Sequence, residues 1–164
     1  SVVERYKERP DLLNNVGSSR IYKERKISLH DGGIRTPYIV RWPGNIPEGL
    51  VDSKSILHGV DWLPTVASIC NVDLPKSQYD GIDVKQAFFG KGVKRKDAVY
   101  WTHNKSAACI KENWKCIIDA AGEFFLYDIE KDPSELQNVK ADFPELAKEL
   151  EHQLREWQKK IQKN

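Results

Sequence analysis

The fold class of the C-terminal half is decided by the stretch Ala107-Ala108-Cys109-Ile110-Lys111-Glu112-Asn113-Trp114-Lys115-Cys116-Ile117-Ile118. Two runs rich in apolar and β-branched residues flank Glu112-Asn113, which predicts a β-hairpin with a two-residue turn. In that register Cys109 lies opposite Cys116 in a hydrogen-bonded pair, whose Cα atoms are about 5.5 Å apart. This distance permits a disulfide, whereas the usual behaviour of free Cys favours two unlinked strand cysteines.

Two further apolar runs lie on either side of this hairpin, at Val99–Trp101 and Phe124–Tyr127. The gaps between the runs hold Asn104 and Ala121-Gly122, which are residue types common in turns. Four short strands joined by short turns predict a small antiparallel sheet of about four strands.

A long helix near residues 142–162 is the last predicted element. Asp142 and Glu145 fit a capping box, with Asp142 as N-cap. Apolar residues follow at spacings of three and four along one helical face: Leu146, Leu150, Leu154, Trp157 and Ile161. This face needs a partner, and the preceding sheet is the natural one. We therefore expect residues 76–164 to form a C-terminal α+β subdomain.

The N-terminal half has a different pattern. Residues 1–25 are polar and lack periodicity, and Asp31-Gly32-Gly33 predicts a tight turn with positive φ at glycine. Tyr38-Ile39-Val40 lies between Pro37 and Pro43 and reads as a short buried strand.

A helix is predicted next. Asp61 is its expected N-cap, Pro64 falls in its first turn, and Asn71 ends it. Its expected apolar face contains Leu63, Val66, Ala67 and Cys70. A strand, a connection and a helix in this order suggest the end of an α/β sheet, so we expect residues 1–75 to be the tail of a larger α/β domain.

Composition narrows the possible functions. The 164 residues carry 26 Lys and Arg against 24 Asp and Glu, a net charge of +2. This balance argues against a nucleic-acid binder, and the basic run Lys91–Lys96 reads as a solvated loop. No apolar run approaches the roughly 20 residues that a membrane span requires. The sequence contains no Met and starts at Ser1, so we expect it to be part of a longer protein.

Few motifs of catalysis are present. The sequence has no phosphate-binding glycine loop, no H-E-x-x-H and no C-x-x-C pair. The segment Lys26–Pro37 combines Lys, His, Asp and Arg around two glycines, which fits an anion site or a solvated turn equally well. His103 follows a strand, where functional groups often project, whereas His58 fits a loop or capping role and His152 a solvated one.

Five ordered motifs resemble the formylglycine-dependent sulfatases, in particular the arylsulfatase and N-acetylgalactosamine-sulfatase-like members. They are Lys26–Gly44, Val60–Val66, Asp80–Val84, Trp114-Lys115 and Leu126–Asn138. The resemblance implies the C-terminal portion of an alkaline-phosphatase-like α/β fold and an enzyme that hydrolyses sulfate esters of sugars or aryl alcohols. The resemblance implies a secreted, periplasmic or lysosomal location for the parent protein, and the sequence favours none of the three.

The resemblance also implies roles for individual residues. Lys26 stands where the family has a sulfate-contacting lysine, while Ile27 replaces a Gly and His30 an aromatic residue. Arg35 matches a family arginine that is structural more often than substrate-binding, and His103 lies where substrate-facing loop residues occur. We therefore predict Lys26 as catalytic, with His30, Arg35 and His103 as candidate substrate-binding residues.

The rest of a sulfatase active site is missing from the sequence. The family nucleophile arises in a C/S-x-P-x-R motif, and none of the three Cys has that context. The carboxylates that bind calcium, or another divalent cation, in the family also have no match, so no metal ligand is predicted here. We expect the chain alone to be inactive and to need the N-terminal region of a sulfatase. The alternative is a stand-alone module that binds carbohydrate or protein.

Overall fold

The computed structural model describes residues 21–75 and 79–162. These residues form two compact units. One unit joins the segment up to Thr36 with everything from Ala98 onward, and the other contains Pro37–Asp97. The predicted boundary between residues 75 and 76 concerns the domains of a complete enzyme and stays a prediction. The polar segment 1–25 lies mostly outside the described residues.

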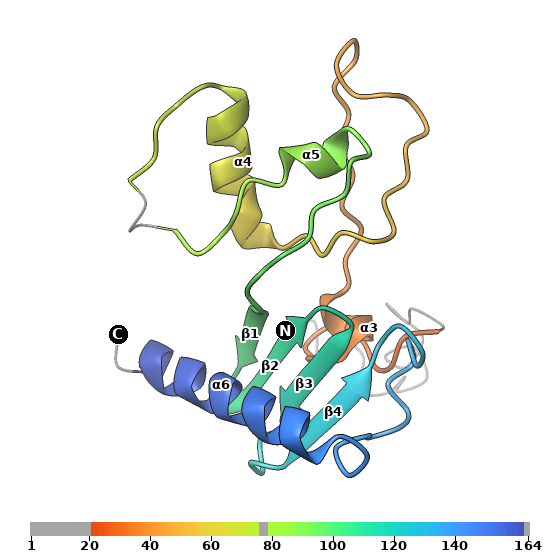
Figure 1. Ribbon diagram of the computed structural model, residues 1–164, viewed down its shortest axis with the longest axis vertical. Helices are drawn as coiled ribbons and strands as arrows, with labels where there is room; N and C mark the ends of the chain where they lie inside the picture. The colour runs from red at the N-terminus through yellow and green to blue at the C-terminus, as the bar shows by residue number, and fades with distance from the viewer. Residues whose placement is uncertain (1–20, 76–78, 163–164) are drawn as a thin grey trace, which may run out of the picture. The chain divides into compact units, whose positions relative to one another are not determined.

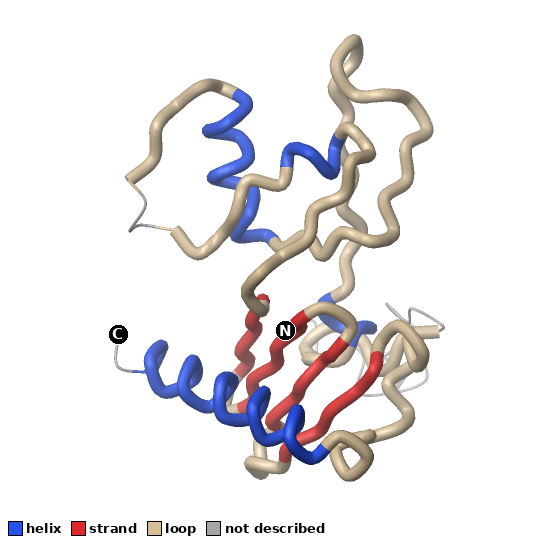
Figure 2. Tube along the Cα trace, viewed as in Figure 1, coloured by secondary structure: helices blue, strands red, loops and turns tan. Residues whose placement is uncertain are grey.

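The first unit is built on a four-stranded antiparallel sheet in the order β1-β2-β3-β4, which confirms the prediction (Figures 1 and 2). The strands are β1 (Val99–His103), β2 (Ser106–Lys111), β3 (Trp114–Ile118) and β4 (Phe124–Asp128). Lys111 pairs with Trp114 around the predicted two-residue turn, and Cys109 pairs with Cys116. Both thiols are buried and free, so the structure has the unlinked alternative.

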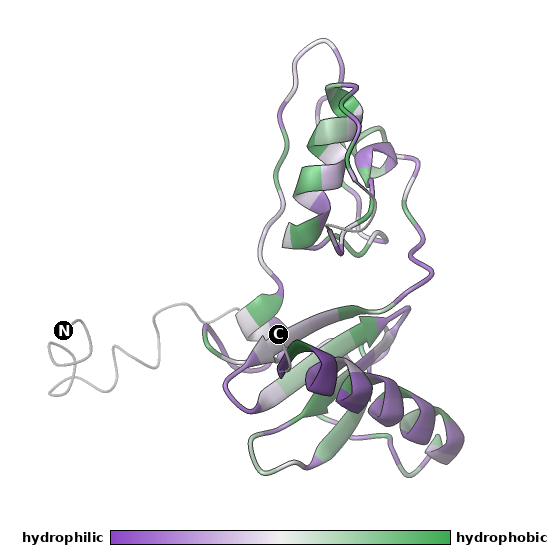
Figure 3. Cartoon of the chain, turned by 90° about the vertical axis from the view of Figure 1, so that its left-hand side faces the viewer, coloured by the Kyte–Doolittle hydropathy of each residue, from purple (hydrophilic) through white to green (hydrophobic). Residues whose placement is uncertain are grey.

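Helix α6 (Pro144–Gln162) covers one face of this sheet (Figure 1). Ala147, Leu150 and Leu154 are buried against the strands, with Leu146 and Trp157 partly buried beside them. The outer side of α6 is hydrophilic (Figure 3). The predicted apolar face of the helix is therefore confirmed.

The predicted start of this helix was wrong. Helix α6 begins at Pro144, and the Phe143 carbonyl accepts the first helical hydrogen bond from Ala147. Proline is favoured at the first helical position and keeps the preceding residue out of the helix. Phe143, not Asp142, is therefore the N-cap residue, and the capping box of Asp142 with Glu145 does not form among the described hydrogen bonds.

The opposite face of the sheet is covered by the segment that contains the short helix α3 (Asp31–Ile34). Leu29 packs there with Ala108, Ile117 and Tyr127. The predicted tight turn at Asp31-Gly32-Gly33 was wrong, because these residues form α3 and neither glycine has a positive φ.

The unit Pro37–Asp97 contains three short helices and no strand among its described residues. Tyr38-Ile39-Val40, predicted as a buried strand, is extended loop, and Ile39 is 87% exposed. A strand needs a neighbour for its backbone N–H and C=O groups. The described part of this unit offers none, so the apolar run stays unpaired.

The helices of this unit are η1 (Gly59–Asp61), α4 (Trp62–Ile69) and α5 (Lys85–Phe88). Its small core contains Val84, Ala87 and Phe88. Helix α4 ends as predicted, with Asn71 at a φ of 54°. Its predicted apolar face was largely wrong, because Ala67 is buried whereas Leu63 is 55% exposed.

Asp61 precedes α4, as predicted, but its carboxylate does not cap that helix. It accepts hydrogen bonds from the backbone N–H groups of His58 and Ile82 and from the Arg95 guanidinium at 2.6 Å. His58 caps η1 by accepting from the Val60 N–H, which confirms its predicted capping role. Arg95 is thus the nearly buried exception in the basic run 91–96.

Candidate functional site

Lys26 lies in a β-turn formed by residues 25–28. The Ser28 N–H donates to the Arg25 carbonyl at 3.0 Å, and Ile27, the third residue of the turn, has a φ of 88°. Lys26 itself is exposed, and its ammonium forms no hydrogen bond or ion pair with any residue in 21–75 or 79–162. The turn therefore presents the exposed Lys26 side chain without a partner among the described residues.

Helix α3 is in close contact with the backbone of this turn. The Gly32 N–H donates to the Lys23 carbonyl at 3.0 Å. A Cβ atom on Gly32 would lie 2.2 Å from the Glu24 carbonyl oxygen, and one on Gly33 would lie 2.1 Å from that of Ser28. Both glycines are therefore required by close approach, rather than by a positive φ.

A cluster of buried charges lies beneath α3. The Lys115 ammonium is 2.6 Å from an Asp31 carboxylate oxygen and 2.8 Å from one of Glu135. The side chains of Lys115 and Glu135 are fully buried, and that of Asp31 is 3% exposed. We call Asp31, Lys115 and Glu135 the buried ion cluster.

Glu135 joins this cluster to α3 in a second way. Its other carboxylate oxygen accepts a hydrogen bond of 2.6 Å from the Asp31 backbone N–H, and His30 Nδ1 lies 3.2 Å from the first oxygen. Burial alone would raise the pKa of Glu135, but the contacts with His30, Lys115 and the Asp31 N–H outweigh it, and the pKa lies below its ordinary value. Glu135 is therefore held as a carboxylate.

The structure places the four predicted site residues in different settings. Lys26 is exposed on its turn, and His30 lies partly buried at the edge of the buried ion cluster. Arg35 pairs with Asp31 at 3.2 Å and lies over the Tyr22 ring, contacts that fit a structural role. His103 ends β1, as predicted, and contacts Asn104, but no described contact joins it to the other three.

Sequence reasoning missed Lys115 and Glu135 as partners of Asp31. Two signals pointed to them: a lysine inside an otherwise apolar strand, and the acidic residue of the segment Leu126–Asn138. Lys115 lies on the side of β3 that faces α3, since it pairs with Ile110 and Tyr127 across the sheet. No sequence pattern pairs these residues with Asp31, which is 84 and 104 positions away.

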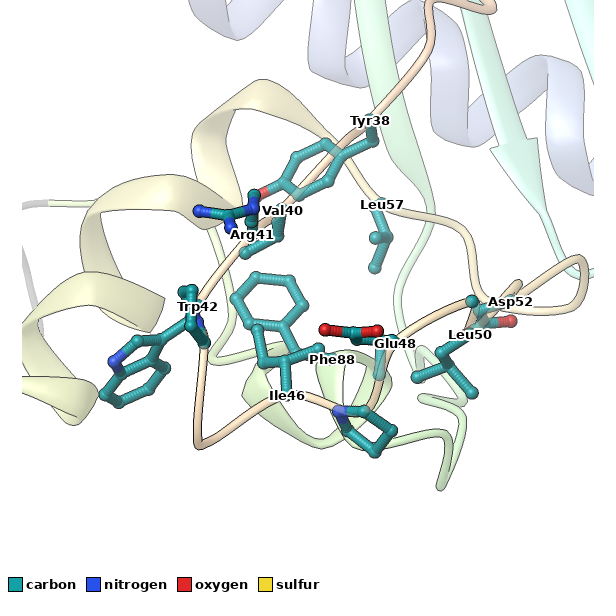
Figure 4. Close-up of a pocket in the computed structure, with 14 residues that line it drawn as sticks. Tyr38, Val40, Arg41, Trp42, Ile46, Glu48, Leu50, Asp52, Leu57 and Phe88 are labelled. Carbon is teal, nitrogen blue, oxygen red and sulfur yellow. The ribbon is translucent and has the colours of Figure 1, made fainter.

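A cavity of about 350 Å³ lies in the other unit (Figure 4). Tyr38, Trp42 and Phe88 line it together with charged residues such as Arg41 and Glu48. It contains none of the predicted site residues.

Within the described ranges, no group of three or more His, Cys, Asp or Glu side chains is placed to hold a metal ion. No helix in these ranges is long and apolar enough to cross a membrane.

Comparison with known proteins places this arrangement in a family. A family model described as N-sulphoglucosamine sulphohydrolase, C-terminal, matches residues 17–160. The chain belongs to this family. It is 30% identical over 157 residues to N-acetylgalactosamine-6-O-sulfatase of Bacteroides thetaiotaomicron, covering 85% of this chain and 30% of the relative. It is 27% identical to human arylsulfatase A over 89 residues, covering 54% of this chain and 17% of the relative.

Solved structures share the fold of this chain. One, described under the metabolism of multiple glycosaminoglycans by Bacteroides thetaiotaomicron, has a TM-score of 0.72 at 24% identity and covers 94% of this chain and 34% of that chain. Another, in complex with its substrate D-glucosamine-2-N,6-O-disulfate, has a TM-score of 0.50 at 25% identity and covers 63% of this chain and 24% of that chain.

The predicted relationship to sulfatases and the alkaline-phosphatase-like fold class are thereby confirmed. The enzymes of the parent family are sulfuric ester hydrolases. The chain spans about a third of the length of the N-acetylgalactosamine-6-O-sulfatase and of the solved structure with a TM-score of 0.72.

Proposed function

We propose that this chain forms the C-terminal part of a sulfatase that hydrolyses sulfate esters of sugars, and that Lys26 contacts the sulfate group. The observation that carries the proposal is the exposed Lys26 ammonium, presented on a turn in a chain whose family model matches residues 17–160. A relative named N-acetylgalactosamine-6-O-sulfatase and a solved structure in complex with a sulfated glucosamine substrate support the substrate class.

The chemistry of the transfer explains why a lysine is needed. Negative charge shifts onto the sulfate oxygens and the leaving oxygen as the ester bond breaks, and a fixed cation lowers that barrier. A lysine ammonium is a compact positive charge, which suits contact with one sulfate oxygen. The nucleophile and the calcium expected in the family would be held by residues outside this chain, and the chain alone is proposed to be inactive.

The test uses the full reading frame that encodes this chain, expressed with its upstream sequence. Sulfate release is measured on N-acetylgalactosamine 6-sulfate, on glucosamine 2-N,6-O-disulfate and on an aryl sulfate. We expect release from at least one sugar sulfate, and a fall in kcat/KM of roughly 100-fold for Lys26→Ala, the size seen when one charge-stabilising contact is lost.

Lys159→Ala is the matched control, because Lys159 is an exposed lysine near the end of α6, paired with Glu156. It should keep full activity. A full-length protein that releases no sulfate from any of the three substrates would refute the proposed activity, and binding of unsulfated sugars without turnover would favour the stand-alone module. Full activity of Lys26→Ala would refute the role of Lys26 alone.

A further inference from the structure

We propose that Lys115 and Glu135 are positioning residues for Lys26, which they hold through Asp31. The inference rests on the proposed function of Lys26. Its structural part is testable by itself: the buried ion cluster of Asp31, Lys115 and Glu135 fastens the loop 21–36 to the sheet, and in this role we call the cluster the clasp. Nothing in the contacts of Lys115 or Glu135 suggests that either one touches substrate, since both side chains are fully buried.

Stability alone gives no preference for a buried ion cluster over apolar side chains at this position. Lys115 lies on a sheet face shared with Ala108, Ile117 and Tyr127, where an apolar side chain would pack well. Burying an ion pair costs desolvation that its mutual attraction often only repays, so apolar residues of similar volume are frequently as stable. What an ion cluster adds is a specific set of partners: the Lys115 ammonium contacts Asp31 at 2.6 Å and Glu135 at 2.8 Å, so both carboxylates are drawn to one point.

That placement is transmitted to the turn through α3. Asp31 is the first residue of α3 and is bound twice, by its carboxylate to Lys115 and by its N–H to Glu135. Gly32 and Gly33, the next two residues, contact the carbonyl groups of the segment 23–28 with no room for a side chain. A shift of Asp31 would therefore move the backbone on either side of Lys26.

The turn itself shows that it is held from outside. Ile27 is β-branched and has a φ of 88°, in a region that such residues rarely adopt. A residue in this region persists only when its surroundings fix it. Ile27 is 70% exposed, so its own side chain supplies little of that fixation, and the contacts of α3 supply it instead.

The experiment removes the clasp without leaving an unpaired buried charge. The triple variant Asp31→Asn, Lys115→Met, Glu135→Gln neutralises all three members, and Glu135→Gln alone serves as a milder second variant. The control is Glu149→Gln, which breaks the exposed Lys111–Glu149 pair on β2 and α6. Hydrogen exchange and kinetics are both measured on the full-length protein.

In hydrogen exchange, we expect backbone amides of Ser28, Gly32 and Gly33 to exchange at least about tenfold faster in the triple variant, while amides of β2 and β3 keep their protection. Glu149→Gln should change neither set. Unchanged exchange in the loop 21–36 for both clasp variants would refute the clasp, whether or not the full-length protein is a sulfatase.

In kinetics, misplacing Lys26 should lower kcat/KM by roughly 10- to 100-fold, mainly through kcat. A double-mutant cycle then distinguishes positioning from general stability. Lys26→Ala should cost little in the triple variant, because the lysine is already misplaced. Independent, multiplying losses would refute the positioning role. An inactive wild-type protein would refute the proposed function and leave the exchange result to decide the clasp.

Discussion

Replacing Ile27 by Asn should stabilise this chain, although it puts a polar residue in place of an apolar one. Ile27 has a φ of 88° at the third position of the turn 25–28, and a non-glycine residue held in such a region costs about 1–3 kcal/mol. Asn adopts positive φ at a lower cost than a β-branched residue. The substitution therefore relieves most of this strain.

The loss that opposes this gain is small. Full burial of an Ile side chain contributes roughly 1.5–3 kcal/mol. Ile27 is 70% exposed, so about a third of that, roughly 0.5–1 kcal/mol, is lost. The net expectation is a gain of about 1 kcal/mol, which raises Tm by about 2–4 °C in a chain of this size.

Urea denaturation and calorimetry measure the change. Ile27→Val is the matched control, because Val keeps the β-branch and hence the strain, and it should change the free energy of unfolding by less than about 0.5 kcal/mol. If Ile27→Asn is no more stable than Ile27→Val, the turn is not strained and the reasoning about its fixation is wrong.

Three further outcomes are expected from the described contacts. The pKa of Glu135 lies below the ordinary value of 4.5, so its carboxylate stabilises the fold above that pH and the stabilisation is lost as pH falls through the lowered value. The difference in free energy of unfolding between wild type and Glu135→Gln should therefore be largest near neutral pH and shrink in acid. Urea titrations at a series of pH values measure this difference. A difference that does not change with pH would contradict the lowered pKa of Glu135. Leu150→Ala should cost about 2–5 kcal/mol in urea denaturation, because Leu150 is fully buried between α6 and the sheet, and a cost below 1 kcal/mol would mean that α6 is loosely docked. A thiol reagent should modify the exposed Cys70 in the native chain, and Cys109 and Cys116 only after unfolding; equal rates for all three would contradict their burial.

The sheet and its helix could be predicted because their signals are local. Each strand is a short apolar run between turn residues, and the apolar residues of α6 recur at helical spacing. The start of α6 failed for a local reason as well: the preference of Pro144 for the first helical position outweighed the acidic pattern that favoured Asp142.

The unit Pro37–Asp97 was harder to predict, because its apolar residues signal burial that the described chain does not supply. Ile39 and Leu63 have the pattern of core residues, yet both are exposed. Periodicity says which residues prefer an apolar partner, but not whether that partner is present.

The candidate site was half predictable. Lys26 and its neighbours form one continuous segment, so a motif could point to them, and the role of Lys26 stays a prediction. Lys115 and Glu135 reach Asp31 only through the fold, and no pattern of spacing links positions so far apart. A lysine in an apolar strand was the available signal, since lysine is almost never fully buried without a partner.

The unit that contains the sheet has contacts between residues that are close along the chain and between residues that are far apart along it. This difference in sequence separation leads us to expect an order of folding. Strands β1 to β4 and α6 follow one another along the chain, so each pairing closes a short loop, whereas Asp31 meets Lys115 across 84 positions. Long closures are entropically costly and come late. We therefore expect the loop 21–36 to dock last. Until then Lys115, with Glu135 as its nearer partner, keeps charged groups on an open apolar sheet face, and these groups hinder the unfinished sheet from associating with another chain.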